Sequence, residues 1–535
     1  MTAQDPSQQN QESDVVSVAH APWLDIPDIV AEVQELKNRF SAADLCVADI
    51  LCDSKPADDT AFILVNGNLD IERLSFGELA QRSKCLASAL SEQGIGVGSR
   101  VGVLMAKTRQ LPIVLLALWR LGAVHVPLFT AFGNEAIASR VNAAQARLII
   151  ADPDQCPKLV GIDIPVLKTG ANLDTLIESH PPLEHNERIG QSGTFIELYT
   201  SGTTGAPKGV RVPAYAIASF IAYMRYGFDL QANDVLWNGA DPGWAYGLFY
   251  SVVGPMATGR ANVLLAAPFT TAITKQVVDA LRVTNFASAP TVYRALRKDG
   301  IRFNTPLRVA SSAGEPLTPE ITDWAPKALG CLVRDHWGQT EQGMGVINAW
   351  DPRLLREPKA GSMGQAMPGF VVGTVGDTIA LSVPNSPLMW FTGYANDARQ
   401  TQERYTKDKL WYLSGDAGRH DGTDVFFAAR ADDVIIASGY RISPFDIESI
   451  LALDPAVSEA AVVGRRYADS VSGEVIEAFI TLASDAATDG LVERLQDLVR
   501  VRYGRHGYPR HIHIVDSLPK TPSGKIRRVD LRNIS

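Results

Sequence analysis

The stretch from residue 198 to residue 210 reads LYTSGTTGAPKGV. A strand is expected to end near Tyr199 and to lead into a loop rich in glycine and hydroxyl side chains, which Lys208 closes. Glycines let backbone N–H groups approach an anion closely, the hydroxyls add donors, and the lysine adds a positive charge. The loop therefore predicts a phosphate-binding site that comprises Thr200, Ser201, Gly202, Thr203, Thr204, Gly205 and Lys208.

Two other interpretations of this loop exist. A flexible surface loop would have much the same composition. A Walker-type phosphate loop is excluded because Pro207 stands where that pattern requires the glycine before its lysine. A conventional P-loop kinase is excluded on the same ground.

Outward from this loop, amphipathic helices alternate with short apolar strands. A helix is expected within 74–94, a strand at 101–106, a helix at 109–121 and a strand at 123–129, and RLIIAD (147–152) and FIELYT (195–200) continue the series. Such alternation favours an α/β fold with layers of largely parallel sheet and helices. The glycines of QGIGVG at 93–98 fall between a helix and a strand, which is the wrong order for a dinucleotide fingerprint and indicates a turn.

A domain boundary is expected near residue 431, before a polar pair of aspartates. The residues beyond it carry their own alternation, with helices at 444–453 and 489–502 and strands at 460–464, 477–483 and 511–516. We expect a flexible N-terminal tail (1–25), a large domain (26–431) and a small mobile α+β domain (432–535).

Composition limits the classes of partner. The chain has 535 residues, too many for one hydrophobic core, and a net charge of −9 from 50 basic and 59 acidic residues. That balance argues against a nucleic-acid or membrane-surface binder. The five cysteines lack metal-ligand spacing, and the first twenty residues lack the features of a signal peptide. We expect a cytoplasmic monomer or homodimer that acts on small molecules.

A second motif, DHWGQTEQG at 335–343, combines a flat aromatic face with oxygen ligands. Trp337 could stack on a base, while Thr340 and Glu341 offer oxygens to a phosphate and a metal. Mg²⁺ prefers one or two carboxylates together with substrate phosphates, so Glu341 is a candidate ligand. Taken alone, a strand end with a core tryptophan is the better interpretation. The segment SSAGEPL (311–317) is a weaker signal, since its small residues would let a planar adenine slide in.

Three further segments carry candidate polar groups. In WYLSGDAGRHDG (411–422), Asp416 could accept hydrogen bonds from both ribose hydroxyls. In RADDVIIASGYRISPFDIES (430–449), Arg430 and Arg441 could meet phosphate. The basic loop PKTPSGKIRR (519–528) contains Lys525. A surface ion pair or a solvated basic tail would explain any single one of these.

Together these segments resemble the superfamily of adenylate-forming enzymes, most closely its short- and medium-chain acyl-CoA synthetases. The resemblance spans about residues 70 to 530 in the family order. It implies that the loop 200–208 holds the β- and γ-phosphates of ATP, that Glu341 binds Mg²⁺, and that Lys525 is catalytic together with Glu341 and Thr340. It also implies a hinge at Asp432, and further ATP and AMP contacts at Gly314, Glu315, Pro316, Asp335, His336, Trp337, Asp416 and Arg430.

The activity implied by the resemblance is ATP-dependent activation of a carboxylic acid as an acyl-AMP, followed by acyl transfer to coenzyme A. The physical logic agrees. A carboxylate is a poor electrophile, and joining it to AMP supplies a leaving group at the cost of bringing two anions together. Lys525 and Mg²⁺ would offset that repulsion. A thiol must then enter where the lysine stood, so a rotation at Asp432 is expected.

The resemblance also assigns the two remaining subsites. The segment Ser438, Gly439, Tyr440 and Arg441 matches the part that lines the pantetheine tunnel of CoA synthetases. The acyl pocket is expected at Trp244, Ala245, Tyr246, Gly247 and Gly338. Acetyl-specific relatives carry a tryptophan where this chain has Gly338, so a deeper pocket is expected, with Tyr246 as its wall and a preference for acids of four or more carbons or an aromatic ring.

Two rival functions remain open at this level. The same adenylate could pass to a carrier protein or to another nucleophile such as an amine. A catalytically silent acyl or nucleotide sensor could share the fold, although the joint presence of Lys208, Glu341, Asp416, Arg430 and Lys525 argues against that.

Overall fold

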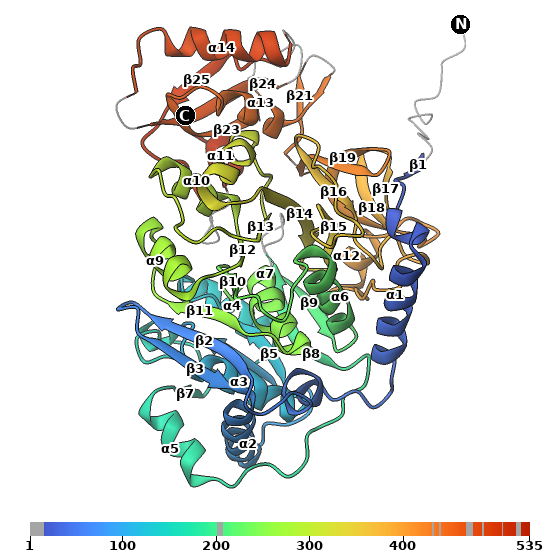
Figure 1. The fold of residues 1–535 in the computed structure, drawn as a ribbon, viewed down its shortest axis with the longest axis vertical. Helices are drawn as coiled ribbons and strands as arrows, with labels where there is room; N and C mark the ends of the chain where they lie inside the picture. Colours follow the sequence, from blue (N-terminus) through green and yellow to red (C-terminus); the bar gives the residue numbers. More distant parts are fainter. Residues whose placement is uncertain are drawn as a thin grey trace, which may run out of the picture.

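The computed structural model describes residues 15–200, 207–430, 433–437, 440–466, 474–483, 486–504, 507–520 and 526–534, with Tyr440 and Arg441 described by their backbone alone. Figure 1 shows the residues after about 435 gathered at one end of the molecule, beyond the larger body formed by the preceding chain.

One layer of the larger body is a 6-stranded sheet, and it matches the predicted α/β alternation. Its strands, in spatial order, are β7 (Val166–Lys168), β6 (Leu148–Ala151), β4 (Arg100–Leu104), β5 (Val124–Pro127), β8 (Thr194–Thr200) and β9 (Lys208–Pro213). The pairs from β7 to β8 are parallel, and β9 returns antiparallel to β8. The segment 93–98 is a turn region before β4, as expected.

A 14-stranded sheet forms the second, larger set of strands. In spatial order these are β1 (Val16–Val18), β17 (Val372–Val375), β18 (Thr378–Ser382), β19 (Trp411–Asp421), β20 (Asp424–Arg430), β16 (Ser362–Ala366), β15 (Gly343–Ile347), β14 (Val333–Gln339), β13 (Val309–Ala313), β12 (Asn285–Ser288), β10 (Leu236–Asn238), β11 (Asn262–Ala266), β2 (Thr60–Asn66) and β3 (Ile71–Ser75).

This sheet is mixed, whereas the sequence predicted largely parallel layers. The strands from β14 through β13, β12, β10 and β11 to β2 are parallel, but every pair from β1 to β15 is antiparallel. The reason lies in the connections. Helices join the parallel strands, whereas short turns such as the one at Gly376 (φ +55°) join antiparallel neighbours.

Twelve α-helices accompany these sheets in the described part of the chain before residue 430, and two of them, at 76–92 and 110–120, confirm the helices predicted within 74–94 and at 109–121. The twelve helices are α1 (Pro27–Phe40), α2 (Phe76–Glu92), α3 (Gln110–Arg120), α4 (Asn134–Ala143), α5 (Ala171–Ser179), α6 (Ala216–Ala222), α7 (Ala245–Gly247), α8 (Gly254–Thr258), α9 (Thr271–Leu281), α10 (Pro290–Lys298), α11 (Pro319–Leu329) and α12 (Ala398–Gln402). Helix α2 begins at an N-cap serine, since the Ser75 hydroxyl accepts a hydrogen bond from the Glu78 backbone N–H at 3.2 Å. Among the described residues, every helix is too short or too polar to span a bilayer.

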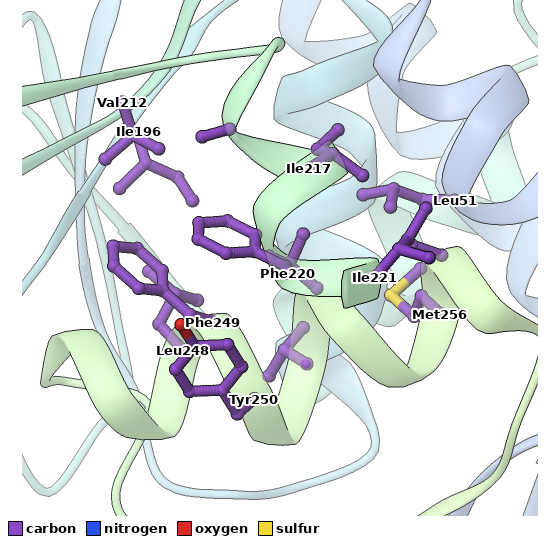
Figure 2. Close-up of a cluster of buried hydrophobic side chains, with 14 of the residues drawn as sticks. Leu51, Ile196, Val212, Ile217, Phe220, Ile221, Leu248, Phe249, Tyr250 and Met256 are labelled. Atoms are coloured by element: carbon purple, nitrogen blue, oxygen red, sulfur yellow. The ribbon is translucent and has the colours of Figure 1, made fainter. Parts of the chain in front are cut away.

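Buried aromatic and aliphatic side chains lock the middle of the chain to the six-stranded sheet. Phe220 of α6 stacks on Phe249, with ring centroids 4.5 Å apart, and Tyr250 meets Phe220 edge-on. Figure 2 shows these rings beside Ile196 of β8 and Val212 of β9. Burying each such side chain contributes about 1.5–3 kcal/mol. This packing fixes the strand pair that leads into and out of the loop at 201–206.

The segment 16–25 belongs to the packed body, which corrects its assignment to a flexible tail. Strand β1 pairs antiparallel with β17, and the buried Trp23 donates its indole N–H to the Phe370 carbonyl at 2.8 Å. The sequence did not predict this strand because a three-residue edge strand carries almost no hydrophobic pattern. Residues 1–14 of the expected tail lie outside the described residues.

The last part of the chain has its own core. Strand β24 (Val475–Leu482) pairs antiparallel with β23 (Val457–Arg465) and parallel with β25 (His511–Ile514), and helices α13 (Pro444–Leu451), α14 (Leu491–Arg502) and α15 (Arg528–Arg532) complete the unit. Its buried side chains form two clusters whose members all lie at or beyond residue 435. A short hairpin, β21 (Ile435–Ala437) with β22 (Tyr440–Ile442), precedes α13.

Candidate active site

The hairpin β8–β9 places both ends of the predicted phosphate loop side by side. Thr200 and Lys208 are register partners at the end of this hairpin where the predicted loop joins the two strands. The interior of the loop, from Ser201 through Gly202, Thr203 and Thr204 to Gly205, lies outside the described residues. The structure thus supports the strand-to-loop transition and the position of the lysine.

Glu341 lies in the turn between β14 and β15, where a hydrogen-bonded chain holds it. The Tyr394 hydroxyl donates to the Glu341 carboxylate at 2.8 Å, and Arg404 Nε donates to the Tyr394 oxygen at 2.9 Å. Glu341 is 7% exposed. A buried carboxylate with one donor on one oxygen keeps capacity for a cation or a further donor. The neighbouring Thr340 is partly exposed.

Lys208 faces the same group of residues. Its Nζ lies 5.4 Å from the centroid of the Tyr394 ring, a cation–π distance. Burial lowers the pKa of Lys208, the charge of Arg404 lowers it further, and Glu341 and Asp397 act in the opposite direction. Lys208 and Arg404 thus place two cations close to Glu341, and cations of this kind form strong hydrogen bonds with phosphate oxygens.

Asp416 is fixed by groups from β14. The Trp337 indole N–H donates to Asp416 Oδ2 at 3.0 Å, and Gln339 Nε2 donates to the same oxygen at 2.9 Å. Gln339 Nε2 and Arg404 Nη1 also both donate to the Ser414 carbonyl, each at 2.9 Å. One hydrogen-bonded network therefore runs from Glu341 through Arg404 to Asp416.

Trp337 packs in the core and also contacts Asp416. It is 7% exposed, so most of its ring is covered by protein. The interpretation of a strand end with a core tryptophan therefore describes its packing correctly. Its indole N–H nevertheless orients Asp416, a role that the sequence did not suggest.

The ends of β13 and β14 supply a second group of candidate residues. Asp335 is buried, its Oδ2 accepts from the Leu317 backbone N–H at 3.2 Å, and burial raises its pKa to about 8. Within the described residues its Oδ1 has no hydrogen-bond partner. Gly314 is exposed at φ +102°, and a Cβ built there would meet no described atom within 4 Å. Pro316 is partly exposed, and Glu315 accepts from Arg294 at 2.9 Å.

The expected acyl-pocket segment forms α7 and the residue before it. Trp244, Ala245 and Tyr246 are all partly exposed, whereas Gly247 is buried. The Trp244 ring packs against Phe129 and Phe132, with centroids 5.4 and 5.3 Å away. This aromatic wall is suited to an apolar acyl or aryl group.

The surroundings of Gly338 correct part of the prediction that this glycine deepens the acyl pocket. A Cβ at Gly338 would lie 2.2 Å from the Gly343 carbonyl oxygen, and one at Gly247 would lie 2.0 Å from the Asp241 carbonyl oxygen. Gly338 stands at the register shift in the β14–β15 pair. Backbone packing therefore requires glycine here, and the residue is not simply the space left by a missing tryptophan.

Several predicted residues are described in part or not at all. Arg430 ends β20 opposite Asp416. The backbones of Tyr440 and Arg441 pair with Ala437 and Ile436 in the β21–β22 hairpin. Ser438, Gly439, Asp432 and Lys525 lie outside the described residues.

Sequence reasoning missed Tyr394, Arg404 and Gln339. Gln339 lies inside a motif that had been singled out, so its position could have drawn attention. Tyr394 and Arg404 lie more than 50 residues from Glu341, in a segment with no periodicity or motif that marks them. Strand β9 belongs to the 6-stranded sheet and strands β14 and β19 to the 14-stranded sheet. The approach of these side chains therefore depends on how the fold packs the two sheets and the segment of Tyr394, which bridges to Val210 of β9.

Comparison with known proteins finds similarity over most of the chain. The profile described as AMP-binding enzyme matches residues 51–392, and the profile described as AMP-binding enzyme C-terminal domain matches residues 446–525. The acetyl-coenzyme A synthetase of Bacillus subtilis (strain 168) is 32% identical over 85% of this chain and 84% of its own length. The mitochondrial acyl-coenzyme A synthetase ACSM3 of Rattus norvegicus is 33% identical over 97% of this chain and 93% of its own length.

Solved structures agree with the sequence comparison. The crystal structure of the Brucella canis acyl-CoA synthetase superposes with a TM-score of 0.73 at 35% identity, covering 95% of this chain and 98% of that one. The two profiles, the coverage and the site network lead to one assignment. The chain belongs to the AMP-binding enzyme family.

Proposed function

We propose that the chain is an AMP-forming acid–CoA ligase, which uses ATP to convert a carboxylic acid to an acyl-AMP and then transfers the acyl group to CoA, releasing AMP and pyrophosphate. One observation carries the proposal. Lys208, Glu341 and Asp416 come from distant parts of the chain, yet Tyr394 and Arg404 connect them in one network of short contacts.

The residues present fit ATP. Lys208, beside the loop that begins at Thr200, would meet the terminal phosphates, and Asp416 would accept from the ribose hydroxyls. The buried Asp335 oxygen without a described partner fits a polar group on the edge of adenine, because a buried unsatisfied polar group is costly until it is paired. The open space above Gly314 fits a planar ring.

Glu341 is suited to bind Mg²⁺ as its single protein ligand. In the described part of the chain, no group of three or more His, Cys, Asp or Glu side chains is arranged to hold a metal. A magnesium ion bound through one carboxylate, ATP phosphates and water would not require such a group. When bound, the ion would neutralise phosphate charge and polarise the phosphoryl oxygens.

The chain's own residues would then assist the approach of two anions. Lys208 and the Arg404–Tyr394 pair hold positive charge beside Glu341, and Lys525 would add a cation at the α-phosphate and the carboxylate. Donors that are already oriented cost no reorganisation when the charge develops, so such groups lower the barrier to acyl-AMP formation.

The acid itself would lie against Trp244 and Tyr246. We expect acids of four or more carbons or with an aromatic ring, with Tyr246 limiting the length. Each buried methylene should add about 0.8 kcal/mol of binding, close to fourfold in kcat/KM. The close contact between Gly338 and Gly343 means that pocket depth should be tested at Tyr246, with Tyr246→Ala, rather than at Gly338.

We propose that residues 432–535 form a small domain that turns about Asp432 between the two half-reactions, relative to a large domain at 26–431. The separate hydrophobic clusters beyond residue 435 support this division. The hydroxyl of Ser443 donates to the Ala428 carbonyl at 2.5 Å, a contact across the proposed boundary that a rotation would break. Asp432→Pro should retain pyrophosphate exchange and slow thioester formation, because proline fixes φ near −65°.

The proposed setting is the cytoplasm, with the chain acting as a monomer or homodimer on small molecules. All five cysteines are free thiols, which suits a reducing compartment.

The test of the main proposal is an ATP–pyrophosphate exchange assay over a panel of carboxylic acids. Each acid is then incubated with ATP and CoA, and AMP and thioester are measured. CoA-dependent AMP release in step with thioester supports the ligase. Exchange without thioester would move the function to another acceptor, and the absence of exchange with every acid would refute adenylation.

A further inference from the structure

A chain of hydrogen bonds runs from the expected acyl pocket into the core. The hydroxyls of Tyr246 and Tyr223 lie 3.1 Å apart, and the Tyr223 hydroxyl lies 2.7 Å from His336 Nδ1. On its far side, His336 Nε2 lies 3.1 Å from the carbonyl oxygen of Asn348. The three side chains form a relay that ends on a backbone acceptor.

The direction of every bond in this relay follows from its end. A backbone carbonyl can only accept, so His336 Nε2 must carry the hydrogen. Burial lowers the pKa of His336 to about 3, so the ring is neutral and its Nδ1 is an acceptor. Tyr223 must then donate to Nδ1, which leaves its oxygen to accept from Tyr246. The single hydroxyl hydrogen of Tyr246 is therefore donated to the Tyr223 oxygen and is not available to a substrate.

Of the three side chains in the relay, only Tyr246 is accessible to a substrate. Tyr223 is 0% exposed and His336 is 2% exposed, whereas Tyr246 is partly exposed on α7. A molecule in the pocket that reaches this network therefore meets Tyr246 first. Its phenol oxygen keeps acceptor capacity but offers no hydrogen.

The side chains around Tyr246 are largely apolar, which affects the strength of a hydrogen bond to its oxygen. The Tyr250 ring lies 5.3 Å from the Tyr246 ring, but its hydroxyl already accepts from the Met344 backbone N–H at 2.9 Å. Around Tyr250 the wall is apolar, as the packing of Phe220 and Phe249 in Figure 2 shows. An acceptor in an apolar wall strengthens any hydrogen bond made to it, because the local dielectric is low.

We propose that the preferred acid carries an uncharged hydrogen-bond donor, a hydroxyl or an aromatic amine, which donates to the phenol oxygen of Tyr246. This inference rests on the proposed function and names the substrate class of the same site. An ammonium group is excluded, since desolvating a charge beside apolar residues is costly. An acid with only an acceptor at that position, such as a methoxy or keto group, would place its oxygen lone pairs against those of the Tyr246 oxygen, and no hydrogen would lie between them.

The test compares acids of matched size in the pyrophosphate-exchange assay. Each ω-hydroxy acid is paired with the acid in which a methyl replaces the hydroxyl, over a range of chain lengths. Para- and meta-hydroxybenzoate are each paired with the methyl- and methoxybenzoates. A net hydrogen bond of about 1 kcal/mol corresponds to roughly fivefold in kcat/KM. At the chain length that reaches Tyr246, the hydroxyl acid should have a kcat/KM higher than that of its methyl partner by about that factor or more.

Three variants separate the relay from general damage to the pocket. Tyr246→Phe should abolish the preference for the hydroxyl acid over its methyl partner. Tyr223→Phe releases the hydrogen of Tyr246, so the discrimination against methoxy acids should fall while the hydroxyl acid is still accepted. The matched control is Tyr226→Phe, since Tyr226 is also buried and donates its hydroxyl to Glu32 at 2.6 Å. It should leave both ratios unchanged.

The outcomes keep the two proposals apart. If no acid supports exchange, the proposed function fails. If exchange is robust but the methyl acid equals or exceeds the hydroxyl acid in every pair, the function stands and the relay inference is overturned. A hydroxyl preference that survives in Tyr246→Phe would also overturn it. Thermal unfolding of each variant shows whether a loss of all activities reflects folding, and the substrate ratios are then read from the variants that remain folded.

Discussion

Replacing Tyr394 by phenylalanine removes one oxygen from the centre of the site and leaves the ring. The hydroxyl donates to Glu341 at 2.8 Å and accepts from Arg404 at 2.9 Å, so it links a carboxylate to a guanidinium. Hydrogen bonds to charged groups contribute about 1.5–3 kcal/mol each. Because the ring stays, the 5.4 Å contact of Lys208 with the ring face is retained.

If the lost bond is made in the transition state for adenylation, the exchange rate should fall about tenfold to 150-fold, at about 1.4 kcal/mol per factor of ten. The Mg²⁺ concentration for half-maximal exchange should rise as well, because Glu341 loses the donor that orients it. Pyrophosphate exchange at saturating acid, titrated with Mg²⁺, measures both quantities. Conversion of supplied acyl-AMP to acyl-CoA should change little.

Tyr405→Phe is the matched control for this prediction. Tyr405 lies in the same aromatic cluster, but its hydroxyl donates to the Phe391 carbonyl at 3.0 Å rather than to a charged group. It should keep the wild-type rate within a factor of a few. The reasoning is refuted if Tyr394→Phe retains both the rate and the Mg²⁺ dependence, or if the two variants lose activity equally.

Four further predictions follow from single residues. Lys208→Met should slow pyrophosphate exchange about 10² to 10³-fold, with Lys208→Arg retaining more activity; an unchanged rate would remove the lysine from the phosphate site. Lys525→Ala should abolish adenylation and spare thioester formation from supplied acyl-AMP, and equal loss of both half-reactions would mean a structural role. Gly338→Ala should lower the free energy of unfolding by about 1–3 kcal/mol, because its Cβ would meet the Gly343 carbonyl oxygen; urea denaturation measures this, and wild-type stability would contradict it. Asp335 has a native pKa of about 8 against an ordinary 3.8, so the native state holds a proton that the unfolded state has lost, and wild-type stability should fall as pH rises between those values. Asp335→Asn does not titrate, so its stability relative to wild type should increase over that range, whereas a constant difference would show that the carboxyl is not buried as described.

The family-level conclusions could be drawn from the sequence because they depend on local patterns. The run from Leu198 to Val210, the Gln-Thr-Glu turn and the alternation of apolar strands with amphipathic helices are all encoded within short windows. Local chemistry also determined the candidate roles of Lys208, Glu341 and Asp416. The alternation predicted a largely parallel sheet with helices between its strands, and strands β4, β5, β6 and β8 confirm it.

The tertiary structure decided what depends on distant contacts. Strand β1 and the antiparallel half of the large sheet escaped prediction, since short edge strands and turn-connected strands carry little periodicity. Arg404 and Tyr394 reach Glu341 because the fold packs these segments together, although they are 63 and 53 residues away along the chain. Gly338, which the sequence suggested as open pocket space, is held by backbone contact with Gly343. The direction of the Tyr246–Tyr223–His336 relay likewise follows from burial and from the carbonyl of Asn348, the residue after β15, and no local pattern in the sequence marks either one.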